Sequence, residues 1–266
     1  MKTIKLNSEG TDVELLQKLL NEWGFEVSIS GKFDIETKKA VLNFQVFNKL
    51  AADGIVGKKS WAILQNKQQQ ELAQTRLKQV DFTRAANALN VEVAAIKAVQ
   101  EVETGGRGGF FAPNKPAILF EGHIFWNQLK KVGKDPEGLI KGNENIIYPK
   151  WSKSHYAGGI REYDRLDKAI KIDEAAAKKS TSWGLFQIMG FNYEICGCKD
   201  VDEFVSYMTE NEGKQLDLFV KFLQGNGWDK YLQALDWKEF ARHYNGPAYA
   251  KNKYDELLKK AYLKYR

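Results

Sequence analysis

Apolar residues recur at helical spacing through most of the chain, and this pattern predicts a mainly α-helical protein. The clearest segment is 94–102, where apolar side chains cover most of the helix surface and Lys97 and Gln100 form one polar strip. Four glycines between positions 105 and 109 end this helix. The pattern therefore predicts a buried helix that breaks into a glycine-rich loop.

Two acids lie near the end of this helix. Glu101 and Glu103 are two residues apart, so their side chains point to different faces. Glu101 follows Lys97 by one turn on the polar strip, where an exposed ion pair is expected. Glu103 follows Ile96 and Val99 on the apolar side, where burial and the negative end of the helix dipole raise a carboxyl pKa. A carboxyl that keeps its proton near neutral pH suits a general acid for glycoside cleavage, whereas a plainly solvated last-turn glutamate is the alternative.

The first part of the chain shows three short amphipathic patterns. One recurs from position 12 and ends at Gly24, a second starts at about Ile35, and a third starts at Lys58 after a turn-rich stretch. They predict a three-helix bundle in residues 1–65. Residues 66–80 are polar and rich in Gln, and are expected to link two domains as coil or as helix.

Residues 81–266 are expected to form the larger domain, with further helices and room for minor β structure. An apolar stretch at 118–126 carries Glu121 and His123, and an acid there is expected to have either a structural partner or a functional role. Residues 162–179 predict one amphipathic helix. The apolar stretch after Ser182 is expected to be helical and to contain Gln187, whose amide needs hydrogen-bond partners that a substrate can supply.

Composition narrows the function classes. The net charge of +6 and the pI near 9.0 suit attraction to an anionic polymer. No nucleic-acid-binding motif is present, so no nucleic acid partner is expected. No apolar run reaches the roughly 18 residues of a membrane helix, and the N-terminus lacks an apolar signal segment, so synthesis in the cytoplasm without membrane insertion is expected.

Metal and disulfide chemistry have little support in the sequence. Cys196 and Cys198 are too close for an ordinary disulfide and are expected to be reduced. His123, His155 and His243 are far apart and lack the HExxH spacing of a zinc peptidase. The sequence therefore predicts no metal and no cofactor.

The N-terminal part resembles the peptidoglycan-binding type 1 module, and the DGIVG stretch followed by Trp61 is the most specific match. It departs from the family pattern at Phe33–Asp34, where the family usually has Phe-Gly. The resemblance implies a three-helix bundle that binds the glycan or peptide stem of the cell wall, with Asp53, Gly54, Ile55 and Val56 as the expected contacts. The matching residues are Gly10, Val13, Leu16, Gln17, Leu20, Gly24, Gly31, Phe33, Thr37, Ala40, Val41, Phe44, Gln45, Leu50, Asp53, Gly54, Ile55, Val56, Gly57, Trp61 and Leu64.

Three separated elements of residues 85–262 resemble the lysozyme-like superfamily, and most closely the N-acetylmuramidase family of modular phage endolysins. These elements are Glu103-Thr104-Gly105, the SWGLFQIMG block, and Tyr244-Asn245-Gly246-Pro247. The resemblance implies a helical lysozyme-like catalytic domain in residues 81–266. It makes Glu103 the general acid, with Glu101 as the alternate if the alignment slips by two residues. It also implies that the sugar cleft is lined by Gln187, Tyr244 and Asn245, with Trp183 and Gly184 as further contacts.

The second catalytic group stays open at this stage. Glycosidases pair the acid with a base at about 6.5–9.5 Å or a nucleophile at about 5–5.5 Å. Glu121 is the first candidate, and Asp164 and Asp173 follow. If no second carboxylate faces Glu103, the substrate's own acetamido group assists or the product is an anhydro-sugar.

Together these features predict a monomeric phage endolysin that hydrolyses the β-1,4 bond between N-acetylmuramic acid and N-acetylglucosamine. Its partner is peptidoglycan, which it reaches after release from the host cytoplasm. Two alternatives remain: a lytic transglycosylase of the same fold, and a wall-binding protein whose catalytic fold is inactive.

Overall fold

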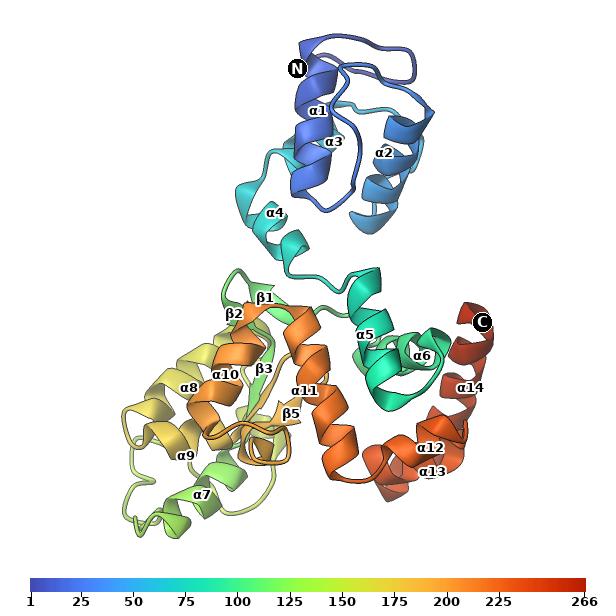
Figure 1. The fold of residues 1–266 in the computed structure, drawn as a ribbon. Coiled ribbons are helices and arrows are strands. Elements are labelled where there is room, and N and C mark those ends of the chain that lie inside the picture. Colours follow the sequence, from blue (N-terminus) through green and yellow to red (C-terminus); the bar gives the residue numbers. More distant parts are fainter. The chain divides into compact units, whose positions relative to one another are not determined.

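The structure, a computed structural model, describes the backbone of residues 1–266 and every side chain except those of Gln68 and Ala248. The chain divides into two compact units, Met1–Thr75 and Arg76–Arg266. Helices dominate both units, and the few short strands belong to the second (Figure 1). The predicted fold class, mainly α with minor β, is confirmed.

The first unit is a small helical bundle whose polar residues are used inside it. Gln17 is fully buried and its amide binds the loop before α2, accepting from the backbone N–H groups of Ser30 and Gly31. Asp34 caps α2 by accepting from Thr37 N at 2.8 Å. The helices are α1 (Thr11–Glu22), α2 (Ile35–Phe47), α3 (Lys58–Leu64) and α4 (Lys67–Gln74).

The boundary between the units lies inside the stretch 66–80. This stretch holds α4 and the beginning of α5 (Gln79–Leu89). Ala73 of α4 is buried in the core of the first unit, and Gln74 Nε2 donates to Glu22 O at 3.0 Å. Most of the Gln-rich stretch is therefore helical, and α4 packs on the bundle that precedes it.

In the second unit, the long helix α11 (Glu212–Gly225) runs between two groups of elements (Figure 1). One group contains the strands, and the other contains α6 (Val93–Thr104), which packs on α5 and α14. The remaining helices are α7 (Gly122–Lys131), α8 (Glu162–Ile170), α9 (Glu174–Lys179), α10 (Val201–Glu210), α12 (Asp229–Gln233), α13 (Trp237–Tyr244) and α14 (Tyr254–Tyr265), with 3-10 turns at Lys153–His155, Gly159–Arg161, Gly190–Asn192 and Pro247–Ala250.

A three-stranded antiparallel sheet lies beside the end of α6. Its order is β3 (Ile118–Phe120), β4 (Thr181–Trp183), β5 (Ile188–Met189), and Ile118 pairs with Trp183. A separate hairpin joins β1 (Phe110–Ala112) to β2 (Lys115–Pro116).

The predicted apolar helix after Ser182 is wrong, because the segment forms the β4–β5 hairpin. Gly184 at φ 73° and Gln187 at φ 51° both adopt left-handed backbone, which cannot continue a right-handed helix. The single helix predicted for 162–179 is also wrong. The chain turns after α8, and Asp173 starts α9 by accepting from Ala176 N at 2.9 Å.

A buried ion pair fastens β3 to α8. Glu162 and Arg165 lie one helical turn apart, their side chains are 0% and 3% exposed, and Arg165 Nη1 donates to Glu162 Oε2 at 2.7 Å. Glu162 also accepts from the backbone N–H groups of Phe120, Ala157 and Gly158. The carboxylate is therefore fully hydrogen-bonded, and it holds three separate backbone segments together.

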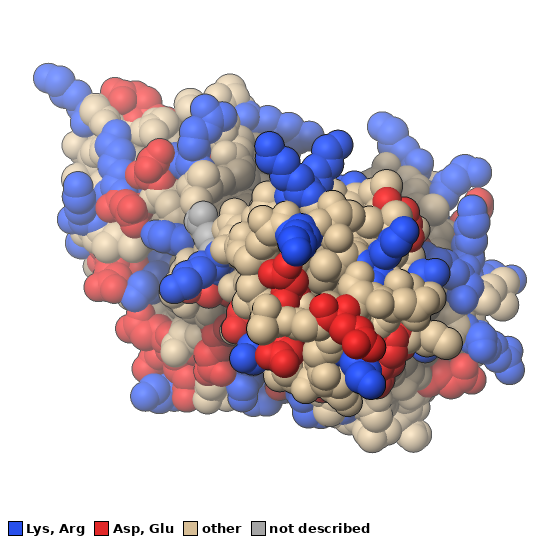
Figure 2. Space-filling view, turned by 90° about the horizontal axis from the view of Figure 1, so that it is seen from above, with Lys and Arg blue, Asp and Glu red and all other residues tan. Residues whose placement is uncertain are grey.

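The surface carries mixed charge. On the face shown in Figure 2, Lys and Arg side chains are dispersed among Asp and Glu rather than gathered into one basic patch. Both cysteines are free and buried. Among the described residues, no helix combines the length and the apolar character needed to cross a membrane.

Candidate active site

The end of α6 separates its two acids as predicted. Gly105, at φ 56°, caps the helix with left-handed backbone. Glu101 lies on the outer side, where Lys264 Nζ donates to it at 2.7 Å and Tyr265 Oη also donates to it. The expected partner, Lys97, instead places its ammonium over the rings of Phe82 and Tyr265.

Glu103 faces the interior of the second unit. Asn245, the residue after α13, donates from Nδ2 to both carboxyl oxygens at 3.2 and 3.0 Å. Burial raises the pKa of Glu103 to about 7, against the smaller opposing effect of the Asn245 hydrogen bond. Glu101 shows the contrary behaviour, because its hydrogen bonds with Lys264 and Tyr265 lower its pKa. Of the two acids, only Glu103 keeps a large protonated fraction at neutral pH.

Two cavities adjoin at Glu103 and Gln187, which line both of them, and we refer to the pair as the groove. The larger cavity has a volume of about 600 Å³ and the smaller one about 300 Å³. The larger is lined by Glu103, Thr104, Arg107, Gly108, Phe111, Ala117, Ile118, Leu119, Gly159, Ser182, Gly184, Leu185 and Gln187. The smaller is lined by Glu103, Phe186, Gln187, Ile188, Met189, Asn192, Phe222, Trp228 and Tyr244.

Gln187 lies at the tip of the β4–β5 hairpin, and protein groups already satisfy its amide. Its Nε2 donates to Ala117 O at 3.1 Å and Gly184 O at 2.8 Å, while its Oε1 accepts from Ser182 Oγ at 2.9 Å. In this structure the partners come from the protein itself and not from a substrate. The bonds fix the hairpin that forms one wall of the groove.

The other candidate contacts divide into two sets. Gly184 lines the larger cavity, and Tyr244 lines the smaller one, with its Oη donating to Phe186 O at 3.2 Å. Trp183 does not line either cavity. It is 3% exposed in the core, where its Nε1 donates to Lys178 O at 3.1 Å, so the structure places it where it cannot contact a sugar.

Glu121 lies outside the groove. Tyr156 Oη lies at 2.9 Å from both of its carboxyl oxygens, and His123 Nδ1 is 3.3 Å from its Oε2. Asp173 caps α9 and pairs with Lys134, while Asp164 is exposed on α8. Among the residues described as lining the groove, Glu103 is the only carboxylate.

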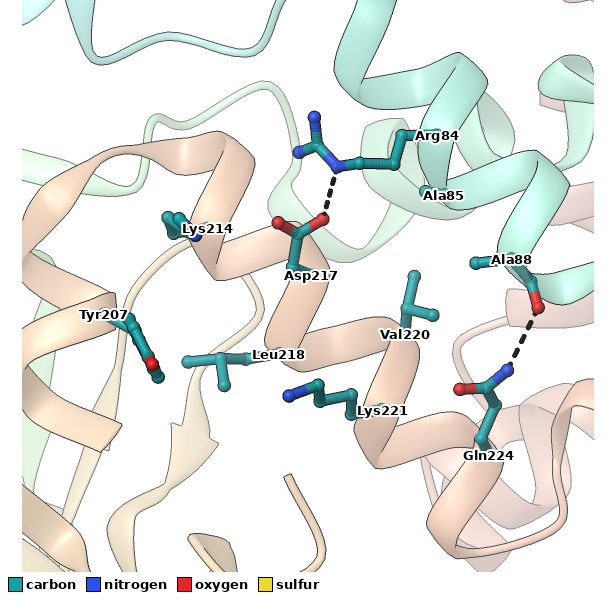
Figure 3. A pocket seen from close by; sticks show the side chains of 10 residues that line it. All are labelled: Arg84, Ala85, Ala88, Tyr207, Lys214, Asp217, Leu218, Val220, Lys221 and Gln224. Carbon is teal, nitrogen blue, oxygen red and sulfur yellow. Dashed lines mark hydrogen bonds and ion pairs between the residues drawn. The ribbon is translucent and has the colours of Figure 1, made fainter. Parts of the chain in front are cut away.

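A third cavity of the second unit, about 370 Å³, lies between α5, α10 and α11 (Figure 3). Its one carboxylate, Asp217, accepts from Arg84 Nε at 2.8 Å, as the dashed line in Figure 3 shows. Lys214 and Lys221 also line it. With its acid bound to a guanidinium, this cavity offers no proton donor for glycoside cleavage.

In the first unit, the expected wall-binding residues separate by burial. Asp53 and Ile55 are exposed and line a cavity of about 250 Å³ together with Lys58 and Lys59. Gly54 and Val56 are buried, and Val56 pairs with Ile4 in the core. Of the four residues, only Asp53 and Ile55 are exposed in this conformation.

Each of the three histidines contacts a different side chain. His155 stacks on Tyr148 and His243 on Tyr231, while His123 lies beside Glu121. Across the side chains that the structure describes, no cluster of three or more His, Cys, Asp or Glu residues is placed to hold a metal ion.

Sequence reasoning missed several residues of the groove. Arg107 and Phe111 follow Glu103 closely in the sequence. Arg107 could have been found from the sequence, because it is the single cation inside a glycine-rich loop. Phe222 reaches the smaller cavity from α11, and Trp228 reaches it from the turn after that helix. Nothing in their local sequence distinguishes them from core aromatics.

The chain matches the family model described as N-acetylmuramidase over residues 92–266, and the model of a putative peptidoglycan binding domain over residues 9–64. The endolysin of Enterobacteria phage PRD1 is 30% identical over 122 residues, which cover 40% of this chain and 80% of that protein. The crystal structure of the Burkholderia AP3 phage endolysin shares 38% sequence identity, with a TM-score of 0.70 and coverage of 99% of both chains.

Proposed function

The chain belongs to the N-acetylmuramidase family, and from this premise we propose that Glu103 is its general acid. The enzyme is a peptidoglycan hydrolase of the endolysin type. In the proposal, Glu103 protonates the glycosidic oxygen between N-acetylmuramic acid and N-acetylglucosamine. The observation that carries it is a partly buried carboxyl in the groove whose pKa is raised to about 7.

The proposed step needs a proton donor whose negative charge is stabilised after the proton has been transferred. As the C–O bond breaks, its electron pair moves to the leaving oxygen, which takes the Glu103 proton. The carboxylate that remains is stabilised by the two Asn245 hydrogen bonds already in place. Asn245 Oδ1 is buried without a partner among the described residues, so it is available to accept from a sugar or a water molecule.

The positive charge that develops on the sugar must then be quenched without a second groove carboxylate. Glu121 is bound by Tyr156 outside the groove, so it is not the proposed base or nucleophile. Water then adds to the anomeric carbon, either directly or by opening the cyclic intermediate that the substrate's own acetamido oxygen forms, and the proton that water loses passes to the Glu103 carboxylate or to solvent. Gln187 positions the hairpin wall, while Gly184 and Tyr244 contact the sugars.

We propose that residues 1–65 bind the cell wall and that residues 81–266 cleave its glycan strands. Residues 66–80 link these two domains. Asp53 and Ile55 are the proposed ligand contacts of the binding module, because they line its cavity and are exposed. The protein is proposed to act as a monomer.

Product analysis tests this function. Purified sacculi treated with the enzyme are expected to release fragments that end in reducing N-acetylmuramic acid, as mass spectrometry can identify. Fragments one water lighter, ending in an anhydro-sugar, would make the protein a transglycosylase. Reducing N-acetylglucosamine ends would assign cleavage to the other glycosidic bond.

A further inference from the structure

The larger cavity of the groove contains one cation that the proposed chemistry does not use. Arg107 lies in the loop after α6, and both its backbone N–H and its Nε bind Thr104 O, at 3.0 and 3.2 Å. The base of the guanidinium is thereby fixed one residue from Glu103. Among the described residues that line the groove, Arg107 is the only cation.

The terminal nitrogens of Arg107 are not engaged by the protein. No ion pair or further side-chain hydrogen bond joins them to a described residue. The neighbouring Arg76 differs, since it packs against Gly108 and pairs with Glu212 at 3.0 Å. An arginine paired with Glu103 would also hold the pKa of that acid down, whereas burial raises it. Arg107 is an exposed lining residue of the larger cavity, and its two terminal N–H-bearing groups have no partner among the described residues. The lining of that cavity holds no acid except Glu103.

The substrate offers an anionic group that fits this arrangement. Of its two alternating sugars, N-acetylmuramic acid alone carries a lactyl substituent, which bears a carboxylate or continues into a peptide stem with carboxylates of its own. A guanidinium binds a carboxylate through two parallel hydrogen bonds. Resting on the proposed function, we propose that Arg107 forms a subsite for the carboxylate of the muramyl substituent, and so fixes which sugar lies on each side of Glu103.

The experiment compares wild type with Arg107→Gln and Arg107→Lys on two substrates. One is intact sacculi, and the other is glycan strands stripped of peptide by an amidase, which expose the lactyl carboxylate. Arg107→Gln is expected to lower the initial rate at subsaturating substrate about ten- to a hundredfold, as loss of hydrogen bonds to a charged group does. Arg107→Lys is expected to recover part of the rate, because lysine keeps the positive charge but cannot form the two parallel hydrogen bonds of a guanidinium.

The two substrates identify the source of the carboxylate. A loss on stripped strands assigns it to the lactyl group, and a loss confined to intact sacculi assigns it to the peptide stem. Lys221→Gln is the control, since it removes one positive charge from the cavity of Figure 3 and is expected to leave both rates unchanged.

A neutral ligand separates specific recognition from damage to the groove. In a Glu103→Gln background, the affinity for an N-acetylglucosamine tetramer is expected to be the same with and without Arg107→Gln. An equal loss of affinity for this neutral ligand, or unchanged rates on both substrates, would overturn the subsite. If wild type itself releases no reducing N-acetylmuramic acid, the proposed function fails instead.

Discussion

Replacing Glu103 with Gln is expected to slow peptidoglycan cleavage by about 10²–10⁴-fold, the contribution typical of a positioned general acid. Gln keeps the shape of the side chain and can still accept from Asn245, but it has no proton to give to the leaving oxygen. The measurement is the rate of turbidity loss of outer-membrane-stripped cells. Because the substitution is isosteric and removes a carboxyl from a buried position, the variant is expected to remain folded.

Two matched variants test whether the effect belongs to Glu103 alone. Glu101→Gln removes an acid two residues away that is bound by Lys264 at the surface, and Glu121→Gln removes one bound by Tyr156 outside the groove. Both are expected to clear cells within a few-fold of wild type. Normal clearing by Glu103→Gln together with failure of Glu101→Gln would transfer the role to Glu101.

The second large effect concerns stability. Glu162→Gln is expected to lower the free energy of unfolding of the second unit by about 3–5 kcal/mol, because it leaves the buried Arg165 charge without its partner. For a unit of this size, that corresponds to a fall in Tm of roughly 10 °C. Thermal unfolding followed by circular dichroism measures it.

The chain contains a close control for this substitution. Glu239 and Arg242 are also one turn apart with a 2.7 Å contact, but their side chains are 31% and 54% exposed. Glu239→Gln is therefore expected to change stability by about 0.5 kcal/mol or less. Equal effects of the two substitutions would show that burial does not determine the value of the Glu162–Arg165 pair.

Local patterns in the sequence were sufficient for the mainly helical fold class and for placing the two acids of α6 on different faces. Apolar spacing placed Glu103 on the inner face of α6, because that choice depends only on residues within two turns. The turns of the N-terminal module could be predicted for a similar reason, since a glycine such as Gly54, at φ 72°, marks a backbone conformation that depends on local sequence.

The hairpin that forms the groove wall could not be predicted in the same way. Residues 183–189 are apolar enough for a helix, and the left-handed conformation of Gln187 is unusual for a residue other than Gly, Asn or Asp. It is stabilised by bonds to Ala117 and Ser182 that only the folded sheet brings near. The resemblance implied Trp183 as a cleft contact, whereas all three residues of β4 are buried and the Trp183 ring lies in the core.

The partners of the acids depended on contacts distant in sequence. Asn245 is 142 positions from Glu103, and only the resemblance to a family placed it near the cleft. For Glu121, the apolar neighbours indicated that the acid would have a partner but did not identify it. Tyr156, which binds it, comes from a loop with no helical or strand periodicity.

The most direct test of the central claim is an NMR titration of the Glu103 carboxyl carbon, assigned by the signal that disappears in Glu103→Gln. The midpoint is expected near pH 7, because burial disfavours the charged form. The acid is then protonated and active below that pH, and the cleavage rate falls about tenfold per pH unit above it. A midpoint near 4.5, the ordinary value for glutamate, would leave Glu103 ionised at neutral pH and would contradict its role as the general acid.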